Sequence, residues 1–482
     1  QYIDDTKNIL VLFVIFSIVF TLITSSTISL AKDDMIDSLE SIQGNRLVFT
    51  ENGLDTLFDI ICPLTFSFTD GELDQDVPLN PEKNHSKIKL RDAMMMFAID
   101  DVDVTIDSVN PFMGLNISFS DCFFYSRWHI SFFDKLNLDL FRGDIFLTMP
   151  ADKIEMKIII EPYTADNSLY CSVISCDTNL NAESFKIDLD HFHFIPRFVV
   201  DDLAHAVLDK QIDKIVETIV EEINITFKLP EYTEGSYIIV TNNMSDIDIS
   251  SGSFIAFYDT DIKPRLNNPP FDFDYYGIQN GSETLADMNG YDIRIDINDT
   301  TINQGLKAIA DEGLLSYSMN IPLMGEIYSL DFQPLTAPSV FLDDPDKDYE
   351  CVLDSNFTFS VHDTSHNYSI INFDFSIAIN LEFLEKDGYF IFIDPLENVY
   401  FNITRLEILE NNLNLNVSNI VSIINDYVVP VVNWLISQYK IVGEFTIDDN
   451  RFPHDVTLSL IDNGIQVGQR TISIGLKLEK DG

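Results

Sequence analysis

Positive charge is scarce in this chain of 482 residues, which has 29 lysines and arginines against 78 aspartates and glutamates. The formal net charge of −49 repels phosphate backbones and anionic bilayer surfaces over most of the molecule. We therefore expect no nucleic-acid partner. The acidity serves instead to keep a chain with 46% hydrophobic residues in solution.

Catalytic and metal-binding signatures are missing as well. The sequence contains no Gly-x-Ser-x-Gly nucleophile elbow and no phosphate-cradling glycine loop. No Cys-x-x-Cys pair suggests zinc, and no acidic segment has the central glycine of a helix-loop calcium site. His191 and His193 lie two apart on a predicted strand and could share a metal, but the polar face of that strand is the simpler interpretation. The sequence thus predicts neither an enzyme nor a metal or cofactor site.

Cysteine is infrequent, and its five copies agree with an oxidising compartment without defining the bridges. Cys171 and Cys176 are near neighbours that flank a predicted turn, so they form one candidate disulfide. Cys62 and Cys122 could meet through tertiary contact and form a second. Cys351 is then left as the odd thiol.

Acceptors for N-linked glycans, with the pattern Asn-X-Ser/Thr, are spread over the whole chain after residue 80. A single match is weak evidence, but this spread favours a secretory route and an extracellular or lumenal location. The acceptors are Asn84, Asn116, Asn224, Asn243, Asn280, Asn298, Asn356, Asn367, Asn402 and Asn416.

A long uncharged run occupies the N-terminal region from Ile9 to Ala31. As a helix it would rise about 34 Å, enough to cross a hydrocarbon core of about 30 Å. Its most apolar part, Ile9 to Ile23, fits a signal-peptide core equally well, and Ser29-Leu30-Ala31 is an acceptable cleavage site. Both alternatives stay open, and a retained membrane anchor through residues 9–31 is our working expectation.

Beyond this run, helical and strand patterns alternate along the first half. Glu51–Ile61 is a predicted amphipathic helix that Pro63 ends. Alternating apolar residues between 102 and 160 then predict a strand meander in an antiparallel sheet with one apolar face. A long helix follows over Val199–Ile223, with an apolar stripe at helical spacing.

The pattern restarts in the second half. Ile293–Ile297 predicts a strand, and Thr300 or Thr301 could cap the short helix that follows and that Gly313 ends. Phe373–Phe383 is the longest alternation in the chain and predicts another strand.

A second long helix is predicted over Asn419–Leu435, where Pro430 removes a backbone hydrogen bond and bends the axis. A long bent apolar helix needs a curved apolar partner, which a strongly twisted antiparallel sheet supplies. Each half thus runs short helix, strand meander, long helix, which indicates a weak internal duplication.

Three short motifs occur in order along the chain: Glu51-Asn-Gly-Leu-Asp55, Asn267-Asn-Pro-Pro-Phe271 and Tyr427-Val-Val-Pro430. With these motifs, residues 48–478 resemble the bactericidal/permeability-increasing protein family, which includes the lipopolysaccharide-binding, phospholipid transfer and cholesteryl ester transfer proteins. One departure is that the helix over 199–223 has no cysteine, where family members commonly have one that bridges back to a strand.

The resemblance implies an α+β fold of two tandem elongated barrels in a boomerang shape. Each barrel would be a highly twisted antiparallel sheet wrapped round a long helix, and a central sheet and proline-rich linker would join them. Residues 1–31 would be the apolar helix or signal segment, 32–253 the N-terminal barrel, 254–290 the central strand and linker, and 291–482 the C-terminal barrel.

The function implied by the resemblance is that of an extracytoplasmic lipid-binding or lipid-transfer glycoprotein. A phospholipid or other acyl lipid would lie in an apolar slot between each helix and its sheet, with lipids and membranes as partners and no covalent step. The alternative is a structural subunit of a membrane or cell-surface complex, with filled slots and protein partners. The residues expected to line the slots are Leu54, Leu57, Phe58, Ile61, Leu208, Ile212, Ile215, Ile219, Ile302, Leu306, Ile309, Ile420, Ile424, Val428 and Val431.

Overall fold

The structure is a computed structural model of the chain, and it describes residues 45–423 and 440–481 apart from internal gaps. The predicted N-terminal apolar segment, the helix over 199–223 and most of the helix over 419–435 lie outside the described residues. No helix in the described ranges is long and apolar enough to cross a membrane. The gaps are 63, 69–74, 79–85, 108–111, 133–137, 149–153, 166–167, 179–185, 190–231, 235–237, 251, 267, 278, 280–282, 286–287, 324–325, 348, 365–367, 387–388, 396–401, 413–415, 443 and 448–454.

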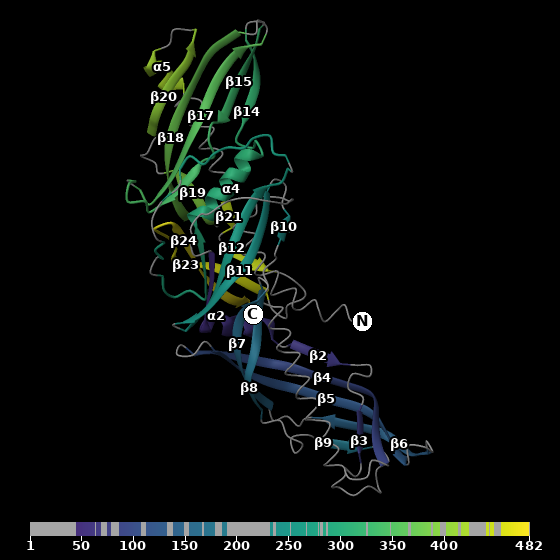
Figure 1. The fold of residues 1–482 in the computed structure, drawn as a ribbon. Helices are drawn as coiled ribbons and strands as arrows, with labels where there is room; N and C mark the ends of the chain where they lie inside the picture. The colour runs from purple at the N-terminus through teal and green to yellow at the C-terminus, as the bar shows by residue number, and fades with distance from the viewer. Residues whose placement is uncertain are drawn as a thin grey trace.

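Three antiparallel sheets lie in a row along the molecule, one at each end and one between them (Figure 1). Strand is the dominant structure of the described residues, because alternating apolar and polar residues run through most of them. The helices described are short: α2 (Glu51–Ile61), α4 (Asp299–Asp311) and α5 (Val417–Ile423).

The N-terminal sheet follows α2 in the chain and forms one end of the molecule (Figure 1). Its two longest strands pair along most of their length, which at about 3.3 Å per residue gives a sheet roughly 70 Å long. Its strands are β2 (Leu64–Phe68), β3 (Gln75–Pro78), β4 (Ser86–Asp107), β5 (Phe112–Phe132), β6 (Leu138–Thr148), β7 (Ile154–Ala165), β8 (Ser168–Thr178) and β9 (Lys186–Leu189).

The C-terminal sheet forms the other end of the molecule (Figure 1). The predicted alternation over 373–383 lies within its longest strand, β18, which pairs with β17, β19 and β20. Its strands are β14 (Tyr317–Leu323), β15 (Glu326–Pro334), β16 (Ser339–Leu342), β17 (Cys351–Asp363), β18 (Tyr368–Lys386), β19 (Tyr389–Pro395), β20 (Asn402–Asn411) and β21 (Lys440–Val442).

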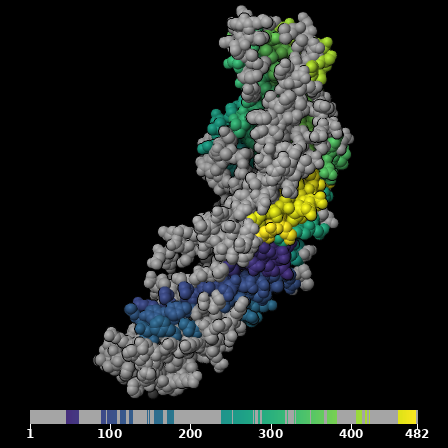
Figure 2. Space-filling model, turned by 180° about the vertical axis from the view of Figure 1, so that it is seen from behind, coloured from purple at the N-terminus to yellow at the C-terminus, as the bar shows by residue number. Residues whose placement is uncertain are grey.

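The central sheet combines strands from both halves of the chain. Its order is β10-β11-β12-β1-β13-β24-β23-β22, so the first described strand lies between strands from the middle of the chain. Figure 2 shows the purple N-terminal residues beside the yellow C-terminal strands at this level of the molecule. These strands are β1 (Asn45–Thr50), β10 (Tyr232–Glu234), β11 (Ile238–Ser250), β12 (Ser253–Pro264), β13 (Ile293–Asn298), β22 (Glu444–Ile447), β23 (Asp455–Gly468) and β24 (Thr471–Asp481).

This arrangement agrees with the expected architecture at a coarse level: two outer antiparallel sheets joined by a central one. No N-terminal apolar helix is seen in the described part of the chain. The central sheet also takes strands from all three segments that the sequence assigned to separate units, 32–253, 254–290 and 291–482.

The ends of α4 differ in how well the sequence predicted them. The helix starts two or three residues earlier than expected, because Asn298 is the N-cap and its side chain accepts a hydrogen bond from the Thr301 amide at 2.8 Å. Thr300 and Thr301 are therefore inside the helix, and the prediction that one of them caps it is wrong. At the other end Gly313 has φ 79°, and its amide donates to the Ala310 carbonyl at 2.8 Å. This left-handed turn ends the helix at the predicted glycine.

Candidate lipid-binding surfaces

The N-terminal sheet has one continuous aliphatic face near the central sheet. Residues in register on β4, β5 and β7 form three adjacent rows, and every one of them is buried. None of them is aromatic, charged or polar, so this face offers only dispersion contacts. The rows are Val102, Ile117 and Met156; Val104, Leu115 and Ile158; and Ile106, Met113 and Ile160.

Helix α2 packs beside this face and closes the edge of β4. Leu54 and Leu57, two of the predicted lining residues, are buried, and the helix contacts β4, β1 and β24. The carboxylates of Glu51 and Asp55 accept hydrogen bonds from the β4 amides of Ile106 and Val104. Burial raises the pKa of the Asp55 carboxyl, while the bond from Val104 opposes that shift. The two carboxylates thus accept the backbone hydrogen bonds that a neighbouring strand would otherwise accept at this edge of β4.

The C-terminal sheet has a different interior, dominated by phenylalanine. Across β15, β17 and β18, the rings form two rows in register on one face, with Leu406 of β20 packed against them. The Phe332 and Phe357 rings stack with centroids 4.5 Å apart, and the Phe359 and Phe373 centroids are 5.3 Å apart. The rows are Phe332, Phe359 and Phe373, and Phe357 with Phe375.

Helix α4 carries three more of the predicted lining residues, Ile302, Leu306 and Ile309, all of them half-buried. Ile309 packs against a small buried cluster that contains Ala308 of the helix and Ile238 of β11. This helix packs mainly on the central sheet, against β11, β12 and β13, and also contacts β16 of the C-terminal sheet.

The remaining predicted lining residues divide into three groups. Phe58 is half-buried on α2. The side chains of Ile61 and Ile420 are not among those described, although both residues lie in helices. Outside the described residues are Leu208, Ile212, Ile215, Ile219, Ile424, Val428 and Val431. A slot between a long helix and an outer sheet therefore remains a prediction.

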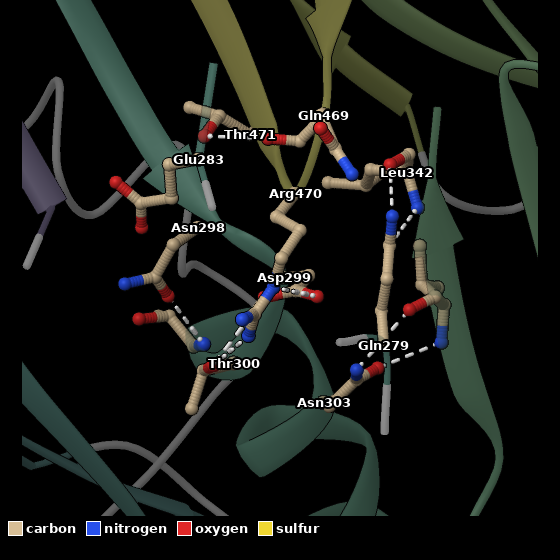
Figure 3. A network of polar contacts seen from close by, with 12 residues as sticks. Gln279, Glu283, Asn298, Asp299, Thr300, Asn303, Leu342, Gln469, Arg470 and Thr471 are labelled. Atoms are coloured by element: carbon tan, nitrogen blue, oxygen red, sulfur yellow. Dashed lines mark hydrogen bonds and ion pairs between the residues drawn. The ribbon is translucent and has the colours of Figure 1, made fainter. Parts of the chain in front are cut away.

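A buried polar network lies between the outer sheets, where α4 meets the turn from β23 to β24 (Figure 3). The Arg470 guanidinium donates to both carboxylate oxygens of Asp299, from Nε at 3.0 Å and from Nη2 at 3.0 Å. The Arg470 carbonyl also accepts from the Asp299 amide at 2.9 Å. This pair fixes the hairpin turn to the first turn of α4.

Two side-chain amides complete the free edge of β16 in the same region (Figure 3). Asn303 accepts from the Val340 amide at 2.7 Å and donates to its carbonyl at 3.1 Å. Gln279 does the same for Leu342, at 2.9 and 2.8 Å. Neither residue could be predicted from the sequence, since an isolated Asn or Gln forms no recognisable pattern until its strand partner is known.

The predicted disulfide between Cys171 and Cys176 is wrong. Both residues lie on β8, which is continuous, so no turn separates them. The extended strand between them spans about 16 Å, beyond the reach of about 7 Å between bridged Cα atoms. No disulfide is seen among the described residues. The Cys122 side chain is outside that set, so its pairing with Cys62 stays a prediction. Cys351 is a buried thiol, and burial raises its pKa to about 12.

The predicted glycan acceptors occupy varied positions. Asn416 is exposed, and Asn116, Asn243 and Asn356 are half-buried on strands. Asn298 is buried as the cap of α4, so a glycan there would have to displace the cap. Asn402 lies on β20 with its side chain undescribed, and the acceptors outside the described residues are Asn84, Asn224, Asn280 and Asn367.

Within the described ranges, no group of three or more His, Cys, Asp or Glu side chains is placed to hold a metal ion. His191 and His193 lie outside these ranges. The described residues thus offer two kinds of surface: apolar faces on the outer sheets, and the buried polar network around Arg470 and Asp299.

Comparison with known proteins gives similarity in structure but not in sequence. No family model matches the chain, and no curated protein matches it. The crystal structure of lipopolysaccharide binding protein aligns over 91% of this chain and 100% of its own, with 10% sequence identity and a TM-score of 0.44. P47 of Clostridium botulinum E1 covers 91% with 99% of its length, at 9% identity and a TM-score of 0.29. Takeout 1 of Epiphyas postvittana covers 35% with 78% of its length, at 11% identity and a TM-score of 0.20.

Proposed function

We propose that this chain is an extracytoplasmic lipid-binding protein of the bactericidal/permeability-increasing protein family, and that its outer sheets hold acyl lipids. One observation carries the proposal: each outer sheet has a continuous apolar face, aliphatic in the N-terminal sheet and rich in phenylalanine in the C-terminal sheet.

The chemistry of the N-terminal face suits an acyl tail. A saturated chain needs dispersion contacts and exclusion of water rather than directional bonds, and a grid of Val, Ile, Leu and Met supplies these. The tail would enter first, with the head group left at the solvent. No covalent step is required.

The cellular setting completes the proposal. Glycan acceptors along the chain support an extracellular or lumenal location, and residues 9–31 would tether the protein to a membrane. Transfer between membranes would then follow from a lipid that leaves the slot without chemical change.

Mass spectrometry of organic extracts from gently purified protein tests the proposal. We expect phospholipid or another acyl lipid at about two molecules per chain, one for each outer sheet. Protein that is free of lipid even after gentle preparation, and that takes up no fluorescent phospholipid, would point instead to a structural subunit with filled interiors.

A further inference from the structure

A short segment that precedes β13 in the chain, Glu283–Leu285, is bonded to strand β1 and to the turn from β23 to β24 of the central sheet, and we name it the strap. The Thr284 amide donates to the Gln469 carbonyl at 3.0 Å, and the Gln469 amide donates back to Thr284 Oγ1 at 2.9 Å. These two bonds fasten the strap to the turn from β23 to β24. The turn is the same one that carries Arg470 to α4 (Figure 3).

The carboxyl group of Glu283, on the strap, lies in a buried site beside Arg46. Its Oε2 lies 2.8 Å from Nη2 of Arg46 on β1, and its side chain is only 10% exposed. Its Oε1 is buried and has no hydrogen-bond partner among the described residues. An ionised carboxylate in this position therefore has only one of its two oxygens solvated by the protein, which is costly in a buried site.

The other charges that face Glu283 come from three elements and are already engaged. Arg470, from the β23–β24 turn, is paired with Asp299 of α4. Asp296 of β13 is paired with Arg294 at 3.1 Å and accepts from Ser473 Oγ at 2.7 Å. Asp296 and Asp299 both oppose a negative charge on Glu283, while Arg46 and Arg470 favour it. Burial outweighs the arginines and raises the pKa of Glu283 to about 7.

We propose that Glu283 is a proton-operated latch that holds the strap on the central sheet when it is neutral and weakens the attachment when it ionises. When the strap is detached, Glu283 is in water and has its ordinary pKa near 4.5. The docked strap therefore binds the proton more tightly than the detached strap. The stabilisation of the docked form is fully present below pH 4.5 and is lost as the pH rises through about 7.

The consequence reaches α4 because the strap and the Arg470 turn share two hydrogen bonds. Detachment of the strap frees the Thr284 and Gln469 amides, and Gln469 is the neighbour of Arg470. Mild acid thus tightens the attachment of the strap to the β23–β24 turn that holds the first turn of α4, and mild alkali loosens it. This inference is independent of whether the outer sheets bind lipid.

Hydrogen exchange of the full-length protein tests the latch, with protection factors corrected for the intrinsic effect of pH on exchange. Between pH 6 and pH 8, protection of Thr284 and Gln469 should fall about tenfold, as linkage between pKa values of about 4.5 and about 7 requires. The variant Glu283→Gln keeps the shape of the neutral side chain and should show no such fall. The matched control is Asp272→Asn in the linker, whose side chain is 95% exposed, and it should keep the wild-type fall.

Two results would overturn the latch. One is wild-type protection at the strap that stays constant from pH 6 to pH 8. The other is a folded Glu283→Gln variant in which the fall persists. Should Glu283→Gln not fold, the wild-type pH series alone decides the question.

Discussion

At the scale of single residues, Arg470 is constrained in both its backbone and its side chain. It is not glycine, yet its φ is 64°, a left-handed conformation that costs about 1 kcal/mol for most residues. Its guanidinium is only 6% exposed and pairs with Asp299, which is 1% exposed. Removing one partner of such a pair leaves a buried charge without compensation, so the pair offsets the backbone strain only while both members are present.

The variant Arg470→Gly should destabilise the protein by roughly 2–4 kcal/mol. Glycine relieves the backbone strain of the left-handed turn, but this gain is smaller than the cost of leaving the buried Asp299 carboxylate without a partner. Chemical denaturation followed by circular dichroism measures this. The control is Asn463→Gly, which relieves a left-handed residue of φ 55° and should change the unfolding free energy by less than about 1 kcal/mol. Equal effects of the two variants would show that the turn, and not the ion pair, matters.

The residue scale is also where prediction from the sequence was weakest. Arg470 and Asp299 are separated by 171 positions, and nothing in either neighbourhood indicates the other. The prediction chose Thr300 or Thr301 instead of Asn298 because Asn and Thr are both favoured N-cap residues, and the local sequence does not decide between them. The sequence predicts a turn between Cys171 and Cys176, but pairing with β7 keeps the strand extended through both.

At the scale of elements, α2 owes its position to a glycine. A Cβ at Gly53 would lie 2.2 Å from the Asp292 carbonyl oxygen, so the helix approaches the segment before β13 more closely than a side chain permits. Asn52 strengthens the same approach with a 2.7 Å hydrogen bond to the Asp292 carboxylate. The helix itself was predictable from its apolar spacing, but this contact was not, because Asp292 is remote in the sequence.

Two glycine-to-alanine variants separate helix propensity from close approach. Gly53→Ala should destabilise the protein by roughly 1–3 kcal/mol, because backbone rather than a flexible side chain must move. Gly305→Ala, in α4, meets only Ile262 Cδ1 at 3.7 Å and should be neutral or stabilising by up to about 1 kcal/mol. Thermal unfolding of the two variants measures both changes in stability. A stabilised Gly53→Ala would contradict the position of α2.

At the scale of the whole molecule, the alternating pattern predicted the strands well, but not which strands share a sheet. The runs at 102–106 and 373–383 are strands because each has one apolar face to bury. The central sheet, by contrast, unites β1, β13 and β24, whose partners lie hundreds of positions apart. Strand partners at that separation leave no local trace in the sequence.

The last prediction concerns what fills the outer sheets. A tryptophan placed on an apolar face takes up volume that either a lipid or protein side chains occupy. Ile117→Trp in the N-terminal sheet and Ile371→Trp in the C-terminal sheet should each lower bound lipid from about two molecules per chain to about one. Asp103→Trp, exposed on the opposite side of β4, should leave the lipid content unchanged.

Stability separates the two interpretations of these variants. Where lipid fills the space, tryptophan displaces it and the folded state keeps its circular dichroism spectrum. Where protein side chains fill the space, the same substitution overpacks a core and costs about 1–3 kcal/mol, with no change in lipid. Because Ile117 and Ile371 lie in different sheets and share no neighbours on their strands, their effects on lipid content should add. A double variant that still binds two lipids would place the lipid elsewhere than on these faces.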